Sequence, residues 1–207
     1  NGSADVNHFH DAWGTRFVIN ELLNQDLLHD DVQTVMGEGL QCFTCKKPSR
    51  DERILQTKEN AFDTQGGLVL LEGNLGRAVM KTSSLKTKKR HFTLHAKVFL
   101  SQEELQTRFK RGELNCDFVA VLPFQGPCAT GMPELHSLSP VFGLLQDQGF
   151  DVVLITDGRM SGASGKFPAA IHTSPEALQG GLLSLVQEND VIEINIEQGT
   201  MTLHVNK

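Results

Sequence analysis

Residues 152–166 read VVLITDGRMSGASGK, and this stretch decides more about the fold than any other part of the sequence. Its first four residues form a short apolar run, which is typical of a strand buried on both faces. A loop rich in glycine, serine and basic residues follows at once. Open α/β sheets bind ligands beyond the carboxyl ends of their strands, so this loop is a candidate binding site.

The residues before this stretch predict a second strand that runs parallel to the first. Residues 117–122, which are apolar after Asp117, predict that strand, and Ser139-Pro140 begins a helix that Gly149 ends. A strand, a helix and a strand in this order imply parallel pairing through a right-handed crossover. We therefore expect the loops that follow the two strands to meet across a shared pocket.

Other segments predict antiparallel pairing in the same domain. Residues 91–98 alternate between apolar and polar side chains, which is the period of a half-buried strand. A capping box predicts a helix over 101–111. Residues 192–205 alternate on both sides of a Gln-Gly pair and predict a terminal hairpin. Because crossovers and hairpins coexist, we expect an α/β domain whose mixed, barrel-like sheet is closed or nearly closed and flanked by helices.

The amino-terminal residues show a helical pattern. Phe9, Trp13 and Phe17 recur every four residues, which predicts one helix over 7–24 with Asp5 as its cap. The sequence opens on Asn-Gly-Ser-Ala-Asp without an initiator Met. We therefore expect the chain to begin in mid-protein.

These patterns predict how the chain is divided. Residues 1–25 are expected to be a terminal helix of a preceding domain. Residues 26–65 are mostly polar and predict a linker with a short strand at most. Residues 66–207 are expected to form the α/β domain.

Composition limits the classes of protein that the chain can represent. Apolar residues make up 39% of the 207 residues, which is enough for a core. The net charge of -6 argues against nucleic acid as a partner. No apolar run approaches the roughly 20 residues that cross a bilayer. We expect a cytoplasmic protein with no membrane partner, in which four cysteines stay reduced.

Two further loops carry side chains suited to chemistry. Residues 131–136 read GMPELH and present Glu134 and His136 after the strand at 117–122. A carboxylate there suits Mg²⁺ or acid–base work. Residues 73–77 read GNLGR, and an arginine beside two glycines suits an anion. For every one of these loops, the pattern by itself is also compatible with an ordinary turn.

The loop at 156–166 has the composition expected around a catalytic serine. Ser161 offers a hydroxyl, and Arg159 and Lys166 offer positive charge. A serine that acts as a base needs such charge, because its alkoxide is otherwise too costly near neutral pH. Cys42 and Cys45 form a single C-x-x-C pair, which is weak evidence for a metal site without a second pair.

The segments at 73–79, 131–136 and 156–165, in this order, closely resemble the dihydroxy-acid and 6-phosphogluconate dehydratase family (IlvD/Edd). Within that family, residues 160–166 and 168–172 resemble the branch that acts on 6-phosphogluconate. The resemblance implies a swivelling β/β/α domain for residues 66–207. It also implies that an amino-terminal domain precedes this chain and packs with it.

The resemblance implies a reaction and its cofactors. The reaction is the dehydration of 6-phospho-D-gluconate to 2-keto-3-deoxy-6-phosphogluconate in the Entner–Doudoroff pathway. It needs an iron–sulfur cluster, expected as 4Fe-4S although the sequence leaves the type open. The cluster ligands are expected upstream of residue 1 and not among the cysteines of this chain. The full-length protein is expected to be a homodimer, and this chain alone to be inactive.

The resemblance also assigns roles to residues. Ser161 is the candidate base that takes the C2 proton, and Glu134 the candidate Mg²⁺ ligand from this domain. Side chains expected to bind the phosphorylated sugar-acid substrate are those of Arg159, Lys166, Arg77, Asn74 and His136. Two alternatives stay open, namely a dehydratase for another sugar acid and a non-catalytic swivel or ligand-binding module.

Overall fold

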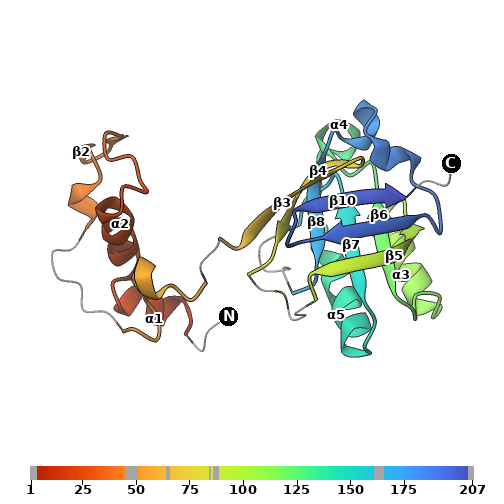
Figure 1. The fold of residues 1–207 in the computed structure, drawn as a ribbon, viewed down its shortest axis with the longest axis horizontal. Helices are drawn as coiled ribbons and strands as arrows, with labels where there is room; N and C mark the ends of the chain where they lie inside the picture. The colour runs from red at the N-terminus through yellow and green to blue at the C-terminus, as the bar shows by residue number, and fades with distance from the viewer. Residues whose placement is uncertain are drawn as a thin grey trace. The chain divides into compact units, whose positions relative to one another are not determined.

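The computed structural model describes residues 4–44, 51–63, 66–83, 85, 89–160 and 166–204. The chain divides into two compact units, residues 1–65 and residues 66–207 (Figure 1). No helix in the described parts of the chain is long and apolar enough to cross a membrane.

The first unit begins with two helices, α1 (Val6–Asp11) and α2 (Gly14–Asn24). The prediction of one helix over 7–24 was therefore wrong. The break lies at Trp13, whose φ of 64° is left-handed and cannot continue a helix. Close packing accompanies the break, because a Cβ on Gly14 would lie 2.5 Å from ring carbons of Phe9. Asp5 caps α1 as predicted and accepts hydrogen bonds from two backbone N–H groups.

The rest of the first unit contains short elements. They are β1 (Gln33–Thr34), β2 (Gly37–Glu38), η1 (Gln41–Phe43) and η2 (Lys58–Asn60). β1 and β2 pair in an antiparallel hairpin. Leu55 is buried against Ala12 and Phe17, so part of the segment expected to be a linker packs on the helices.

The second unit is a closed barrel, with the strand order β10-β3-β4-β8-β7-β6-β5-β9. This confirms the predicted mixed α/β, barrel-like fold. The strands are β3 (Leu68–Gly73), β4 (Gly76–Lys81), β5 (His91–Val98), β6 (Phe118–Leu122), β7 (Val152–Thr156), β8 (Ala169–Ser174), β9 (Val191–Asn195) and β10 (Thr200–His204).

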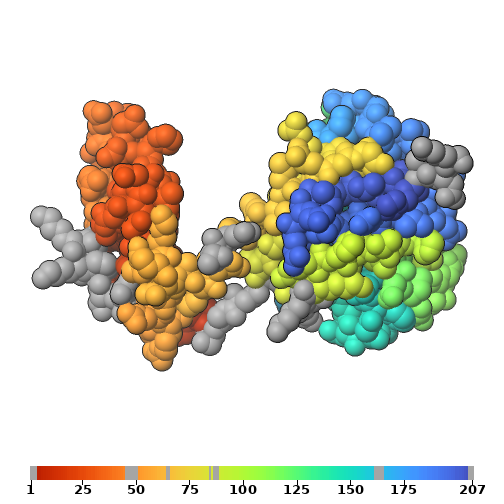
Figure 2. Space-filling view, viewed as in Figure 1, coloured from red at the N-terminus to blue at the C-terminus, as the bar shows by residue number. Residues whose placement is uncertain are grey.

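Parallel and antiparallel pairs alternate in blocks around the barrel. β5, β6, β7 and β8 pair in parallel, which confirms the predicted crossover between β6 and β7. β9 and β10 form the predicted antiparallel hairpin. The barrel closes where β10 pairs in parallel with β3. The face of this unit turned to the viewer in Figure 2 shows β3 and β4 in yellow, β9 and β10 in blue, and β5 in yellow-green.

Helices cover part of the outside of the barrel (Figure 1). These elements are α3 (Gln102–Lys110), α4 (Pro127–Thr130), η3 (His136–Leu138), α5 (Ser139–Asp147), η5 (Ala177–Gln179) and η6 (Leu182–Leu185). The helices at 101–111 and from Ser139 were predicted, and Ser101 caps α3 by accepting a hydrogen bond from the Glu104 N–H.

Two separate cores explain why β6 and β7 are buried along their whole length. Val119 and Val121 point into the barrel and pack in its interior cluster. Phe118, Ala120 and Leu122 belong to a second cluster, which includes residues of α3 and α5. Successive side chains of a strand point to opposite faces, so a strand between two cores must be apolar throughout.

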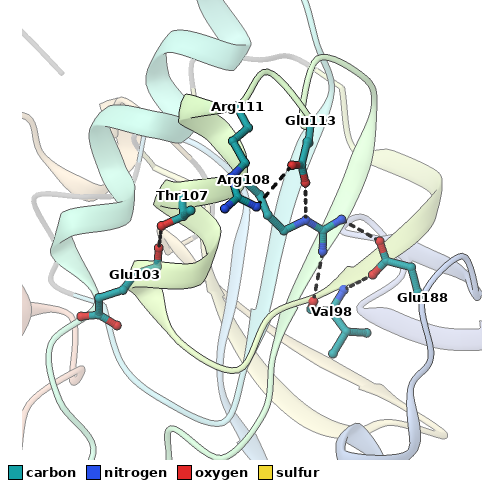
Figure 3. A network of polar contacts seen from close by, with 7 residues as sticks. All are labelled: Val98, Glu103, Thr107, Arg108, Arg111, Glu113 and Glu188. Atoms are coloured by element: carbon teal, nitrogen blue, oxygen red, sulfur yellow. Dashed lines mark hydrogen bonds and ion pairs between the residues drawn. The ribbon is translucent and has the colours of Figure 1, made fainter.

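A polar network ties α3 to the barrel (Figure 3). Arg108 donates a hydrogen bond to Glu188 at 2.8 Å, and its Nε lies 3.5 Å from a carboxylate oxygen of Glu113. Glu188 also accepts a hydrogen bond from the Val98 N–H at 2.8 Å. The Arg108 guanidinium lies over the Phe99 ring. This network therefore joins the end of β5, α3 and the segment before β9.

Candidate functional site

The barrel brings two of the motif loops together at one edge. β6 and β7 are parallel, and Leu122 pairs with Thr156 at their carboxyl ends. The loops that leave this edge meet again, because Glu134 and Arg159 form a parallel β-bridge. The Leu135 N–H donates a hydrogen bond to the Arg159 carbonyl at 3.2 Å. The backbone thus holds the 131–136 loop beside the start of the glycine–serine loop.

The side chains of Glu134 and Arg159 lie close together at this edge. Arg159 Nε is 3.9 Å from Glu134 Oε2, and it donates a hydrogen bond to the Met132 carbonyl at 2.9 Å. The Glu134 side chain is 28% exposed and that of Arg159 is 53% exposed. An oxygen ligand and a fixed positive charge therefore face solvent side by side. Such a pair suits a metal-bound or anionic ligand.

Asp157 is a residue of this edge that the sequence did not single out. It is 2% exposed, and its carboxylate accepts hydrogen bonds from three backbone N–H groups. The donors are Phe124 at 3.2 Å, Gln125 at 2.8 Å and Ala177 at 2.9 Å. The carboxylate at the end of β7 thus holds the loop after β6 and the segment after β8.

A second buried carboxylate, that of Glu176, supports the same loop. Both of its oxygens accept the N–H of Cys128, at 3.1 Å and 3.3 Å. Gly126 lies so close that a Cβ there would be 1.9 Å from a Glu176 oxygen. The Cys128 side chain also hydrogen-bonds with the Glu176 carboxylate, and this bond raises the pKa of the Cys128 thiol. This shift favours the thiol form of Cys128 over the thiolate.

The remaining predicted residues lie in different settings. Ser161 lies outside the described residues. Lys166 is exposed at the other end of the glycine–serine loop, and His136 is exposed at the start of η3.

The third motif loop connects β3 and β4 at the same end of the barrel, because Arg77 pairs with Ser174 at the end of β8. Arg77 is exposed and its Nε lies 3.1 Å from a Glu72 oxygen. Asn74 uses its amide to bond both the N–H and the carbonyl of Leu203, each at 2.8 Å. Asn74 thus fastens the β3–β4 turn to β10, a structural use of the side chain predicted to bind substrate.

The positions of the His, Cys, Asp and Glu side chains bear on whether this chain could bind a metal ion by itself. The described residues contain no group of three or more His, Cys, Asp or Glu that could hold a metal ion. Cys116 precedes β6 and Cys128 follows it on α4, so they lie at opposite ends of one strand. Cys42 is exposed in η1 of the first unit, and Cys45 lies outside the described residues.

Comparison with known proteins identifies the class. Residues 53–207 match the family described as "Dihydroxy-acid/6-phosphogluconate dehydratase C-terminal". The match covers most of the chain, which therefore belongs to the dihydroxy-acid/6-phosphogluconate dehydratase family and contains its carboxy-terminal portion.

Individual relatives show which members of this family the chain is similar to. A protein of Rhizobium meliloti named "Phosphogluconate dehydratase" is 47% identical over 99% of the chain. One of the same name from Pseudomonas aeruginosa is 48% identical over the whole chain. A "Dihydroxy-acid dehydratase" of Ruminiclostridium cellulolyticum is 35% identical over 99% of the chain. The chain spans only 36% of the length of the first two relatives.

Proposed function

We propose that the chain is part of a hydro-lyase that converts 6-phospho-D-gluconate into 2-keto-3-deoxy-6-phosphogluconate and water. The observation that carries the proposal is the backbone bridge between Glu134 and Arg159, which places two motif loops at one edge of the barrel. The names of the relatives support the phosphorylated substrate, since those 47–48% identical are called phosphogluconate dehydratases. The proposal places the reaction in the Entner–Doudoroff pathway and the cytoplasm, with the full-length protein as a homodimer.

Ser161 is the proposed base that takes the proton from C2 of the substrate. It follows Arg159 by two residues in the sequence and precedes Lys166. Their positive charges lower the cost of forming an alkoxide. A carbon next to a carboxylate is a weak acid, so the same charges also favour the anion that forms when the proton leaves. The side chains proposed to contact the substrate further are those of Lys166, Arg77 and His136. Asn74 is proposed to contribute through the turn between β3 and β4, which its amide fixes.

Glu134 fits a role as one ligand of Mg²⁺, because it presents partly exposed carboxylate oxygens at a strand end. A Mg²⁺ ion bound there would stabilise the negative charge that develops on the substrate. Since no group of three such ligands occurs among the described residues, the other ligands are proposed to come from the rest of the longer protein or from the substrate.

The described cysteines do not fit an iron–sulfur cluster. Cys116 and Cys128 are separated by the length of β6. Under the proposal, a 4Fe-4S cluster takes its ligands from residues upstream of residue 1.

The test is the Ser161→Ala substitution in the full-length protein. We expect turnover of 6-phosphogluconate to fall by about 10²–10⁴-fold, because that is what a positioned base contributes. The absorbance of the cluster should stay unchanged, which shows that the site is still assembled. Near-normal turnover would remove Ser161 from the role of base.

The substrate class is tested with the unsubstituted full-length protein. We expect 6-phosphogluconate to react with a higher kcat/KM than unphosphorylated sugar acids. Faster turnover of another sugar acid would instead identify a dehydratase of different specificity. Binding of sugar acids without any turnover would identify a ligand-binding module and reject the proposed reaction.

A further inference from the structure

We infer that Asp157 is a positioning residue, whose carboxylate fixes the strand-end loops so that Glu134 and Arg159 keep their mutual placement. The inference rests on the proposed function, because it assigns these two residues to the site. Asp157 itself is buried and touches neither of their side chains in the described contacts. It therefore acts through the backbone and not on the substrate.

The hydrogen bonds of Asp157 reach two segments that no strand ladder fixes. Oδ1 accepts from Gln125, and Oδ2 accepts from both Phe124 and Ala177. Phe124 has a left-handed φ of 63°, a conformation that costs energy for a bulky residue. The carboxylate thus stabilises the sharp turn at which the loop toward Glu134 begins.

The other end of that loop returns to the same strand. Arg159, two residues after Asp157, forms the bridge with Glu134. Gly158 between them is tightly packed, since a Cβ there would lie 2.7 Å from the Cβ of Gln125. The Gly158 carbonyl also accepts a hydrogen bond from the His172 N–H at 2.9 Å. A shift at Asp157 must therefore move the loop at both of its ends.

The strand pair itself does not require this carboxylate. β6 and β7 are already joined by five consecutive register pairs, from Phe118 with Val152 to Leu122 with Thr156. Burying a carboxylate is costly unless it is hydrogen-bonded, so the burial of Asp157 depends on its three N–H donors. What Asp157 adds is the three N–H contacts to the loops, and these lie at the edge that carries Glu134 and Arg159.

The test compares Asp157→Asn with Asp117→Asn in the full-length protein. Asp117 is a matched control, because it accepts a hydrogen bond from the Asp151 N–H at 2.8 Å at the amino ends of the same two strands. An asparagine at 157 presents one oxygen and one NH₂ group, so at least one of the three N–H donors meets another donor. The control makes the same chemical change away from the site.

Hydrogen exchange gives a readout that does not depend on activity. We expect faster amide exchange of peptides covering residues 123–134 in Asp157→Asn, and faster exchange only around residue 151 in the control. Kinetics give the second readout, at a temperature where both variants are folded. We expect kcat to fall by about 10²-fold for Asp157→Asn, since small misplacements cost that much, and the half-saturating Mg²⁺ concentration to rise by about 10-fold.

The outcomes distinguish failure of the proposed function from failure of the positioning role of Asp157. Absence of turnover in the unsubstituted protein would reject the proposed function. Turnover there, with kcat and Mg²⁺ dependence of Asp157→Asn equal to those of the control, would overturn the positioning role alone. If Asp157→Asn does not fold, Ala177→Pro removes one N–H donor and keeps the carboxylate. This variant should show smaller losses of kcat and of Mg²⁺ affinity than those expected for Asp157→Asn. Unchanged kcat and Mg²⁺ dependence would again overturn the positioning role.

Discussion

Gly158 occupies a space that admits no side chain. A Cβ at this position would lie 2.7 Å from the Cβ of Gln125 and 3.2 Å from Leu135 Cδ1. We expect Gly158→Ala to lower the free energy of unfolding by about 1–3 kcal/mol, which is the usual cost of overpacking. Urea denaturation of the chain, followed by circular dichroism, measures this.

The control for that substitution is Gly143→Ala. Gly143 lies inside α5, and a Cβ there meets nothing within 4 Å. Alanine is a better helix former than glycine, so we expect a gain in stability of about 0.5–1 kcal/mol. Equal effects at the two positions would contradict the steric explanation.

At the scale of single residues, the sequence predicted some of the side chains at the barrel edge that carries Glu134 and Arg159, and it missed others. The approach of the loops of Glu134 and Arg159 follows from parallel strands, whose carboxyl ends must share an edge. Asp157 and Glu176 were missed because a carboxylate that accepts hydrogen bonds from backbone N–H groups leaves no spacing pattern in the sequence. Asn74 was predicted to bind substrate, but its amide is used by Leu203. Sequence cannot distinguish these uses of one side chain.

At the scale of elements, periodicity succeeded where a strand or helix has one uniform environment. β5 alternates as predicted, with Phe92, Leu94 and Ala96 buried. β8 was not singled out, because its register with β4 shifts and His172 has a left-handed φ of 56°. The helical period over 7–24 continues through Trp13 although the backbone breaks there. A repeat of apolar residues does not report backbone dihedral angles.

The Arg108 network gives a prediction for α3 and its attachment. Partial burial of Glu188 opposes its ionisation, but hydrogen bonds from Arg108 and the Val98 N–H outweigh this and lower its pKa below 4.5. Its stabilising effect is therefore complete above pH 4.5 and is lost as the pH falls through the lowered pKa. We expect Glu188→Gln to destabilise the barrel by about 1 kcal/mol at pH 7.

Denaturation across a range of pH checks this expectation. The difference between Glu188→Gln and the unsubstituted chain should shrink as the pH falls below 4.5. Glu197→Gln, at an exposed site between β9 and β10, is the matched control and should leave stability nearly unchanged. A constant difference at every pH would show that ionisation of Glu188 is not involved.

At the scale of the whole molecule, we expect the chain to carry only part of the proposed site. It spans 36% of the length of its relatives, and its described residues contain no group of three metal ligands. We expect the isolated chain to show no turnover of 6-phosphogluconate, whereas the full-length protein is active. A coupled assay for the keto product measures both, and clear activity of the isolated chain would reject the claim that the site is incomplete.

The closure of the barrel also has a consequence for biosynthesis. β3 is the first strand of the second unit and β10 is the last, yet Glu72 and Thr200 are neighbours. During translation, β3 is synthesised well before its partner strand β10. Until β10 has been synthesised, β3 has one open edge, and open edges attract strands of other chains. Nascent chains stalled before β10 should therefore need chaperones more than completed ones.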